Sequence, residues 1–164
     1  MTVVTDHLER LGVRFEVLPH RRSTTALEEA QCLGMGADEV LKGIVLVIET
    51  GYALAIIPAS CRLDLPRVRD ALEDPSAELA TEAAIEAAFP EFELGAIPAL
   101  PSLLHVPVVI DPSVFAHRTV TFAGGVQRES VRLEPGALRH GATVTVAPIA
   151  TPTTPRELAA TGDG

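Results

Sequence analysis

Two apolar runs separated by a short turn constrain the fold of this chain more than any other feature. Residues 44–48 and 52–57 are almost wholly apolar, and Thr50-Gly51 lies between them. So short a connection joins two strands as an antiparallel hairpin. Strands that are apolar on both faces lie in a sheet that is covered on both sides. The sequence therefore predicts adjacent strands over 41–49 and 52–58, at the centre of a mixed sheet.

The other segments switch irregularly between helix and strand patterns. Helical spacing predicts helices over 4–11, 26–33, 65–73 and 81–88, and short apolar runs predict strands at 14–18, 106–110, 119–122, 130–133 and 143–146. This order indicates an α+β (mixed α/β) fold: a single domain over residues 1–150, with a mixed, mostly antiparallel sheet of about six strands flanked by helices. Thr, Pro and Gly dominate from Thr151, which predicts a disordered tail over 151–164.

One helix start carries a specific signature. Thr25 precedes the apolar stripe of the 26–33 helix, and Glu28 follows it by three residues. This spacing predicts a capping box, in which each side chain accepts a hydrogen bond from the other residue's backbone N–H. Gly34 then predicts the end of the helix.

Charge and composition limit the classes of function. The 164 residues carry a net charge of −9 and are 47% hydrophobic. We therefore expect a compact domain and not a protein that grips nucleic acid along its length with excess Lys and Arg. The histidines and cysteines show no metal-type spacing, so we expect no metal and no cofactor. The chain shows no leader pattern and no bilayer-length apolar run, so we expect a cytoplasmic protein without membrane contact.

Lys42 is the only lysine in the chain, beside twelve arginines, and it stands at the head of the first apolar run. A lysine offers a compact ammonium whose pKa responds to burial, whereas an arginine offers a planar fork that stays charged. The alternative is a lysine whose stem lies on apolar surface while its ammonium reaches water. Lys42 is therefore a candidate site residue.

Two glycine-containing loops accompany this lysine. One is punctuated by Gly and Pro over residues 95–101, and the other contains Gly124-Gly125 as a tight turn. Loops of this kind present backbone N–H groups that can hold a carbonyl oxygen or an attacking water. Taken alone, the 95–101 loop is better explained as a plain connection between helix and strand.

The two cysteines allow a different chemistry. A cysteine nucleophile needs a histidine partner and an environment that lowers its pKa. Cys32 lies late in an amphipathic helix, where packing explains it, whereas Cys61 follows a strand end and is the better candidate. An unrelated hydrolase that uses Cys61 is the weakest of the readings.

Taken in order, these pieces resemble the YbaK / prolyl-tRNA synthetase editing-domain family, the aminoacyl-tRNA deacylases. The resemblance is carried by His20, Thr25 with the helix that follows it, Val40-Leu41-Lys42-Gly43-Ile44, Tyr52-Ala53-Leu54-Ala55, Gly95-Ala96-Ile97-Pro98, Val109-Ile110-Asp111 and Ala123-Gly124-Gly125. In the family a Gly-x-x-x-Pro loop approaches the substrate ester with its backbone. Here Ala99 stands at the final position of that loop.

The resemblance implies a freestanding deacylase that hydrolyses the ester of a mischarged tRNA. The expected substrate is a proline-type tRNA that carries Cys, Ala or a similar small amino acid. The implied partners are the tRNA acceptor end and, as a further candidate, an aminoacyl-tRNA synthetase. The implied catalytic residues are Lys42, Gly95, Ala96, Ile97 and Pro98, and the implied substrate-binding residues are His20, Thr25, Gly124 and Gly125.

A rival function belongs to another class. A non-catalytic module of the same fold could recognise a nucleotide, an aminoacyl derivative or a protein. The net charge of −9 favours this alternative, because a protein that handles tRNA usually carries basic surface. Ala99 also favours it, because it departs from the Gly-x-x-x-Pro loop of the family.

Overall fold

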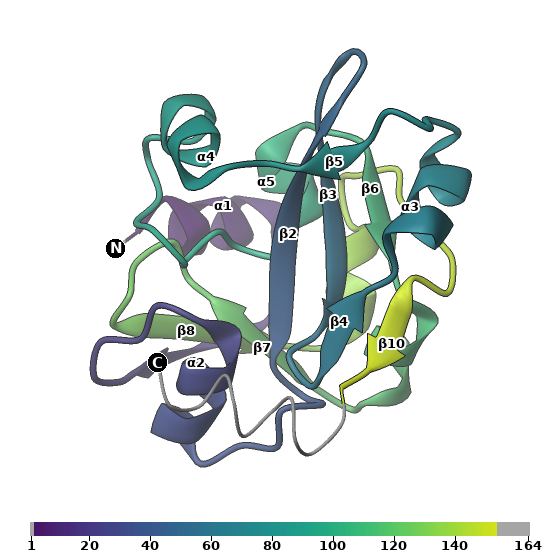
Figure 1. Ribbon diagram of the computed structural model, residues 1–164. Coiled ribbons are helices and arrows are strands. Elements are labelled where there is room, and N and C mark those ends of the chain that lie inside the picture. The colour runs from purple at the N-terminus through teal and green to yellow at the C-terminus, as the bar shows by residue number, and fades with distance from the viewer. Residues whose placement is uncertain (1, 154–164) are drawn as a thin grey trace.

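The predicted hairpin lies at the centre of the molecule. The computed structural model describes residues 2–153. Its largest sheet has the strand order β5 (Glu78–Leu79), β2 (Leu41–Ile48), β3 (Gly51–Pro58), β6 (Val108–Ile110) and β9 (Thr145–Val146) (Figure 1). Strands β2 and β3 are antiparallel, as predicted. Ile48 pairs with Gly51, so the two-residue turn is Glu49-Thr50 and Gly51 begins β3.

The remaining strands form two further sheets. Strands β1 (Phe15–Pro19), β8 (Glu129–Leu133) and β7 (Val120–Ala123) form one, and β4 (Cys61–Leu63) pairs with β10 (Ala150–Pro152) in the other. We expected about six strands in a single sheet. Within the described residues, backbone pairing between β7 and the central sheet is limited to a bridge between Thr121 and Val40, the residue before β2. An apolar run shows that a strand is buried, but it does not show which edge the strand pairs with.

The expected helices are present. The α-helices are α1 (Val3–Leu11), α2 (Ala26–Leu33), α3 (Leu65–Leu72), α4 (Glu82–Ala88) and the short α5 (Pro101–Leu104), which the sequence did not predict; two 3-10 helices are η1 (Pro112–Ala116) and η2 (Pro135–Arg139). Thr25 caps α2 by accepting from the Glu28 N–H at 3.1 Å. The return bond of the predicted capping box is displaced by one residue, because the Glu28 carboxylate accepts from the Thr24 N–H.

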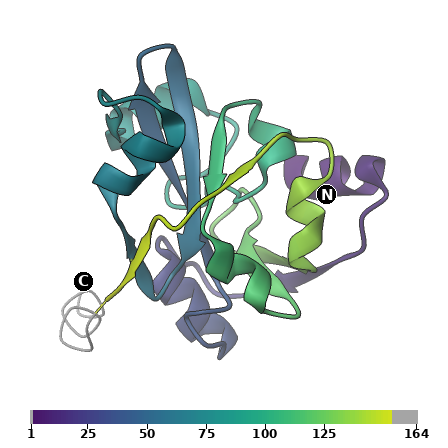
Figure 2. The same ribbon diagram turned by 90° about the vertical axis from the view of Figure 1, so that its right-hand side faces the viewer.

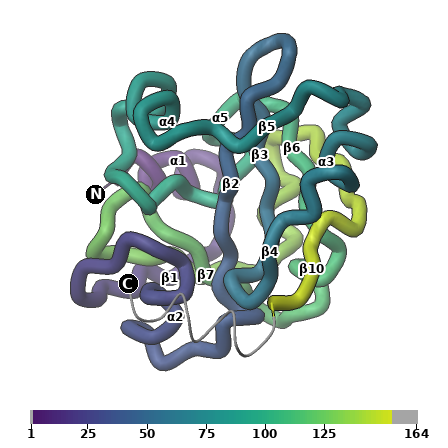
Figure 3. Tube along the Cα trace, in the orientation of Figure 1, coloured from purple at the N-terminus to yellow at the C-terminus, as the bar shows by residue number. Residues whose placement is uncertain are grey.

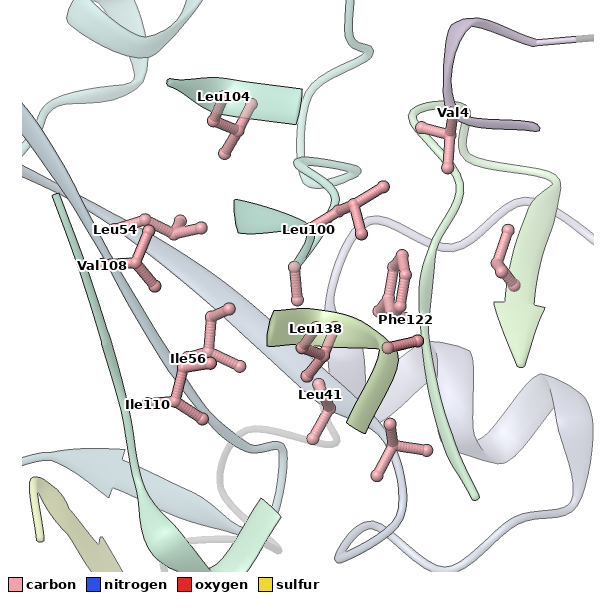
Figure 4. Packing of buried hydrophobic residues seen from close by; sticks show 14 of the residues in the cluster. Val4, Leu41, Leu54, Ile56, Leu100, Leu104, Val108, Ile110, Phe122 and Leu138 are labelled. Atoms are coloured by element: carbon pink, nitrogen blue, oxygen red, sulfur yellow. The ribbon is translucent and has the colours of Figure 1, made fainter. Parts of the chain in front are cut away.

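Strand β3 separates two hydrophobic clusters. Leu54 and Ile56 point into one cluster and Ala55 and Ile57 into the other, because successive side chains of a strand face opposite sides. Figure 4 shows the first cluster, where Ile56 and Ile110 lie side by side. Both faces of β3 are therefore covered, as its apolar composition predicted, whereas Val47 of β2 is 41% exposed.

Part of the expected tail belongs to the fold. Thr151 and Pro152 lie in β10, which pairs with β4 (Figure 2). The Asp111 carboxylate holds the approach to this strand by accepting from the N–H groups of Ile149 and Ala150, each at 2.9 Å. A Thr- and Pro-rich composition did not reveal this tertiary partner. Residues 154–164 of the expected tail lie outside the described part of the chain.

Within residues 2–153, no helix is both long enough and apolar enough to cross a membrane.

Candidate functional site

A cavity of about 390 Å³ lies at the head of β2. Its walls come from the start of α2, residues 41–43 of β2, helix α4, the loop after α4 and the end of β7. Helices α2 and α4 lie on the same side of β2 (Figure 1). The polar side chains in its walls are those of Thr24, Thr25, Glu29, Lys42 and Glu82. The volume falls in the range of small-molecule sites.

Lys42 is half-buried in this wall, where β2 begins. It pairs across the hairpin with Ile57, and within residues 2–153 its ammonium has neither a hydrogen bond nor an ion pair. Burial lowers the pKa of Lys42, while nearby Cys61 acts in the opposite direction. A partly desolvated cation without a partner is poised to bind an oxygen-rich ligand.

The loop after α4 reaches the cavity because Gly95 allows a close contact with backbone. Gly95 has a φ of 73°, and a Cβ atom there would lie 2.0 Å from the Thr24 carbonyl oxygen. A Cβ on Gly43 would lie 3.6 Å from the Ile97 carbonyl oxygen. An L-residue at position 95 would be strained and would also collide with backbone. The loop therefore packs backbone to backbone against the segment that leads into α2.

Gln127 joins the loop after α4 to the segment before α2, and no sequence pattern indicated this role. Its side-chain amide donates to the Leu94 carbonyl at 2.7 Å, and its backbone N–H donates to the Glu93 carboxylate at 3.0 Å. Its carbonyl accepts from the Ser23 N–H at 2.9 Å. Figure 3 shows the chain after α4 passing the β7–β8 connection, where the Glu93 N–H donates to the Gly125 carbonyl at 2.9 Å.

Glu29 is a second residue that sequence reasoning missed. Its side chain lines the cavity with only 3% of the residue exposed. Burial raises its pKa to about 7, although a hydrogen bond from Ser130 acts in the opposite direction. A signal was available, because Glu29 lies three residues after Ala26 and four before Leu33, on the buried stripe of the helix.

The structure brings together only some of the predicted site residues. Lys42, Thr25, Gly95 and Ile97 line the cavity. Their neighbours Ala96 and Pro98 are buried and do not line it.

The remaining three predicted residues, His20, Gly124 and Gly125, do not line the cavity. Gly124 donates its N–H to the Glu129 carbonyl, and Gly125 packs beside Phe92. The residue before them, Ala123, is the one that lines the cavity. His20 reaches the site through Ser130, whose hydroxyl lies 2.8 Å from its Nε2 atom.

Three kinds of functional group face the cavity. These are the ammonium of Lys42, the carboxyl group of Glu29 and the backbone of the Gly95 loop. The Ala96 N–H donates to the Glu93 carbonyl at 3.0 Å, whereas the N–H groups of Gly95 and Ile97 have no acceptor among the described residues. Within that part of the chain, no three His, Cys, Asp or Glu side chains are grouped as a metal site would require. Such an arrangement suits acid–base chemistry on an ester.

The sequence model of the aminoacyl-tRNA editing domain matches residues 20–140. The chain belongs to the aminoacyl-tRNA editing domain family. Every residue that lines the cavity falls within the matched range. No match is found among curated proteins.

Two solved structures share the fold of this chain. The chain is similar to a candidate trans-editing enzyme for prolyl-tRNA synthetase, with 27% identity and a TM-score of 0.77 over 90% of this chain and 94% of that one. It is also similar to a hypothetical protein, with 20% identity and a TM-score of 0.81 over 90% of this chain and 99% of that one. The second likeness establishes the shared fold only.

Proposed function

We propose that this protein is an aminoacyl-tRNA deacylase that acts in trans. Its substrate is the ester of a mischarged, proline-type tRNA that carries Cys, Ala or a similar small amino acid. Family membership and the likeness to a candidate trans-editing enzyme support this function. The observation that carries it is the half-buried ammonium of Lys42, unpaired within residues 2–153, in a cavity of about 390 Å³. A net charge of −9 fits a protein that contacts little of the tRNA beyond its acceptor end.

Hydrolysis needs a held carbonyl and a nucleophile. The N–H groups of Gly95 and Ile97 are the backbone donors free to hold the oxyanion that forms when water attacks the ester carbonyl. Lys42 holds the substrate's carbonyl oxygen or its terminal phosphate. With a cysteinyl ester, the substrate's own thiol can replace water as the nucleophile, and the protein then acts by positioning.

A panel of mischarged tRNAs tests this function. The 164-residue chain is incubated with tRNAs that carry Cys, Ala, Ser and Pro, and loss of the ester is followed in time. We expect faster loss for at least one small amino acid than for correctly charged prolyl-tRNA. Lys42→Ala should abolish the difference, and Cys61→Ala should leave it intact.

The same panel separates the rival functions. Hydrolysis that disappears in Cys61→Ala would instead indicate a cysteine hydrolase. Absence of hydrolysis with every tRNA, together with saturable binding of an aminoacyl-adenosine analogue, would indicate the non-catalytic binding module.

A further inference from the structure

Three side chains from three parts of the chain form a hydrogen-bonded path from the cavity to the surface. Glu29 on α2 lines the cavity, and its Oε2 atom accepts a hydrogen bond from the hydroxyl of Ser130 on β8. The Ser130 hydroxyl lies 2.8 Å from Nε2 of His20, which follows β1. Ser130 is fully buried and His20 is partly exposed. The path therefore begins in the cavity and ends at solvent.

The far end of the path fixes one proton on the imidazole of His20. The Nδ1 atom lies 2.6 Å from the carbonyl oxygen of Arg21. A carbonyl can only accept, so Nδ1 must carry a hydrogen. The remaining nitrogen, Nε2, therefore accepts from Ser130 when His20 is neutral and donates to Ser130 when His20 is charged.

Only two arrangements satisfy every bond in the path with a single mobile proton. In the first, the charged His20 donates to Ser130, and Ser130 donates to an ionised Glu29. In the second, a protonated Glu29 donates to Ser130, and Ser130 donates to a neutral His20. The two differ only in which end holds the proton, so reversing the Ser130 hydroxyl moves a proton between cavity and surface.

The charged groups around Glu29 suit such an exchange. Lys42 from β2 and Glu82 from α4 share the cavity with it, and His20 faces it through Ser130. Within the described residues, Oε1 of Glu29 accepts no hydrogen bond and is not fully buried. This oxygen is the one available to a bound water.

We propose that Glu29 is the acid–base residue of this site and that Ser130 and His20 relay its proton to solvent. This inference rests on the proposed deacylase function. Water attacks the ester carbonyl carbon while Glu29 takes its proton, and the carbonyl π pair moves onto oxygen. The bond from that carbon to the ribose oxygen then breaks, and the ribose oxygen takes the proton from Glu29. The acid product ionises, and its proton leaves through Ser130 and His20.

The first test replaces the acid–base group. Glu29→Gln should lower kcat by about 100-fold or more, with little change in KM. Glu86→Gln, at an exposed position of α4, should match the wild type. The comparison is repeated with an α-hydroxyacyl ester, which lacks the ammonium group. If the loss in Glu29→Gln vanishes with this substrate, Glu29 binds ammonium and the proposal is overturned.

The second test breaks the relay and leaves Glu29 in place. Ser130→Ala should lower kcat about tenfold at pH 7. It should also move the acid limb of the pH–rate profile to higher pH. The hydrogen bond from Ser130 lowers the pKa of Glu29 in the wild type, so its loss raises that pKa. His20→Gln, which can bond Ser130 but cannot pass a proton on, should lower kcat similarly. The matched control is Ser102→Ala, since buried Ser102 also lies 2.8 Å from a histidine Nε2, that of His7, outside the cavity.

A third measurement needs no activity. Carbon-13 NMR of the Glu29 carboxyl should show a titration midpoint near pH 7 in the wild type and a higher midpoint in Ser130→Ala. Identical midpoints in the two proteins would overturn the relay. If the wild type hydrolyses no ester, the proposed function fails while this titration still decides whether the path exists. If the wild type is active and all variants match it, the function stands and the relay is wrong.

Discussion

Lys42 and Glu29 face one cavity, and burial disfavours the charged form of each. It lowers the pKa of the lysine and raises that of the glutamate to about 7. Burial thus shifts both groups toward their neutral forms, and Glu29 can change protonation close to neutral pH. Groups with such shifts inside one cavity are typical of functional sites and not of surface charge.

Replacing Lys42 by arginine should damage deacylation almost as much as replacing it by alanine. The planar guanidinium cannot occupy the point that a compact ammonium fills in a small cavity. Loss of one charge-assisted contact of about 2–3 kcal/mol slows turnover by roughly 30- to 150-fold. Single-turnover rates of both variants, with melting curves to show that they are folded, check this. Wild-type rates in Lys42→Arg would mean that the ammonium only reaches water.

Replacing Glu29 by glutamine should change how stability depends on pH. The unfolded chain loses this proton near the ordinary value of 4.5, and the folded chain loses it near 7. Between these values the folded state holds more protons, so the free energy of unfolding falls as pH rises and remains low above pH 7. The fall is on the order of 3 kcal/mol.

Urea unfolding of the wild type and Glu29→Gln at pH 4.5 and pH 8 measures this effect. The variant lacks this titration. The difference in unfolding free energy, variant minus wild type, should therefore be more positive at pH 8 than at pH 4.5. An equal difference at both pH values would show that Glu29 titrates normally.

At the scale of elements, the site depends on two loops that meet α2 from either side. The loop after α4 packs on Thr24 through Gly95. Gln127, in the β7–β8 connection, bonds both Leu94 in that loop and Ser23 before α2. The sequence predicted the helix cap at Thr25 because capping is local. The contacts of Gln127 join residues about thirty and one hundred positions away, so no local pattern reveals them.

Replacing Gly95 by alanine should impair the site and cost stability. The added Cβ would lie 2.0 Å from the Thr24 carbonyl oxygen, and the φ of 73° is unfavourable for alanine. We expect a loss of about 1–3 kcal/mol in unfolding free energy and at least a tenfold loss of kcat/KM, because the loop must move. The matched control is Gly136→Ala, where φ is not positive and no atom lies within 4 Å of the added Cβ. Equal behaviour of the two variants would contradict the packing argument.

At the scale of the whole molecule, three sheets are held together by side-chain packing and by a few buried polar contacts. The Asp111 carboxylate, next to the end of β6, accepts from Ser113 as well as from the N–H groups of Ile149 and Ala150 at the start of β10. It thereby connects the central sheet to the β4–β10 pair. Burial opposes its ionisation, but these hydrogen bonds together lower the pKa of Asp111.

Asp111→Ala should destabilise the protein by about 2–4 kcal/mol, because buried N–H groups lose their acceptor. The measurement is urea unfolding, with hydrogen exchange at Ile149 and Ala150 to show that β10 loosens first. The control, Asp70→Ala at an exposed position of α3, should stay within about 0.5 kcal/mol of the wild type. A similarly small effect in Asp111→Ala would show that β10 is held by packing alone.

The sequence by itself determined the central hairpin, the helices α1 to α4, the caps of α2 at Thr25 and Gly34, and the place of Lys42 at the head of β2. These features follow from hydrophobic period and from hydrogen bonds that span a few residues. Tertiary structure alone decided the division into three sheets and the two- or three-residue strands β4, β5 and β10. It also decided the path from Glu29 through Ser130 to His20, whose members lie 101 and 110 positions apart along the chain. Such contacts carry no local signature, because their energy comes from burial and pairing that exist only once distant segments have met.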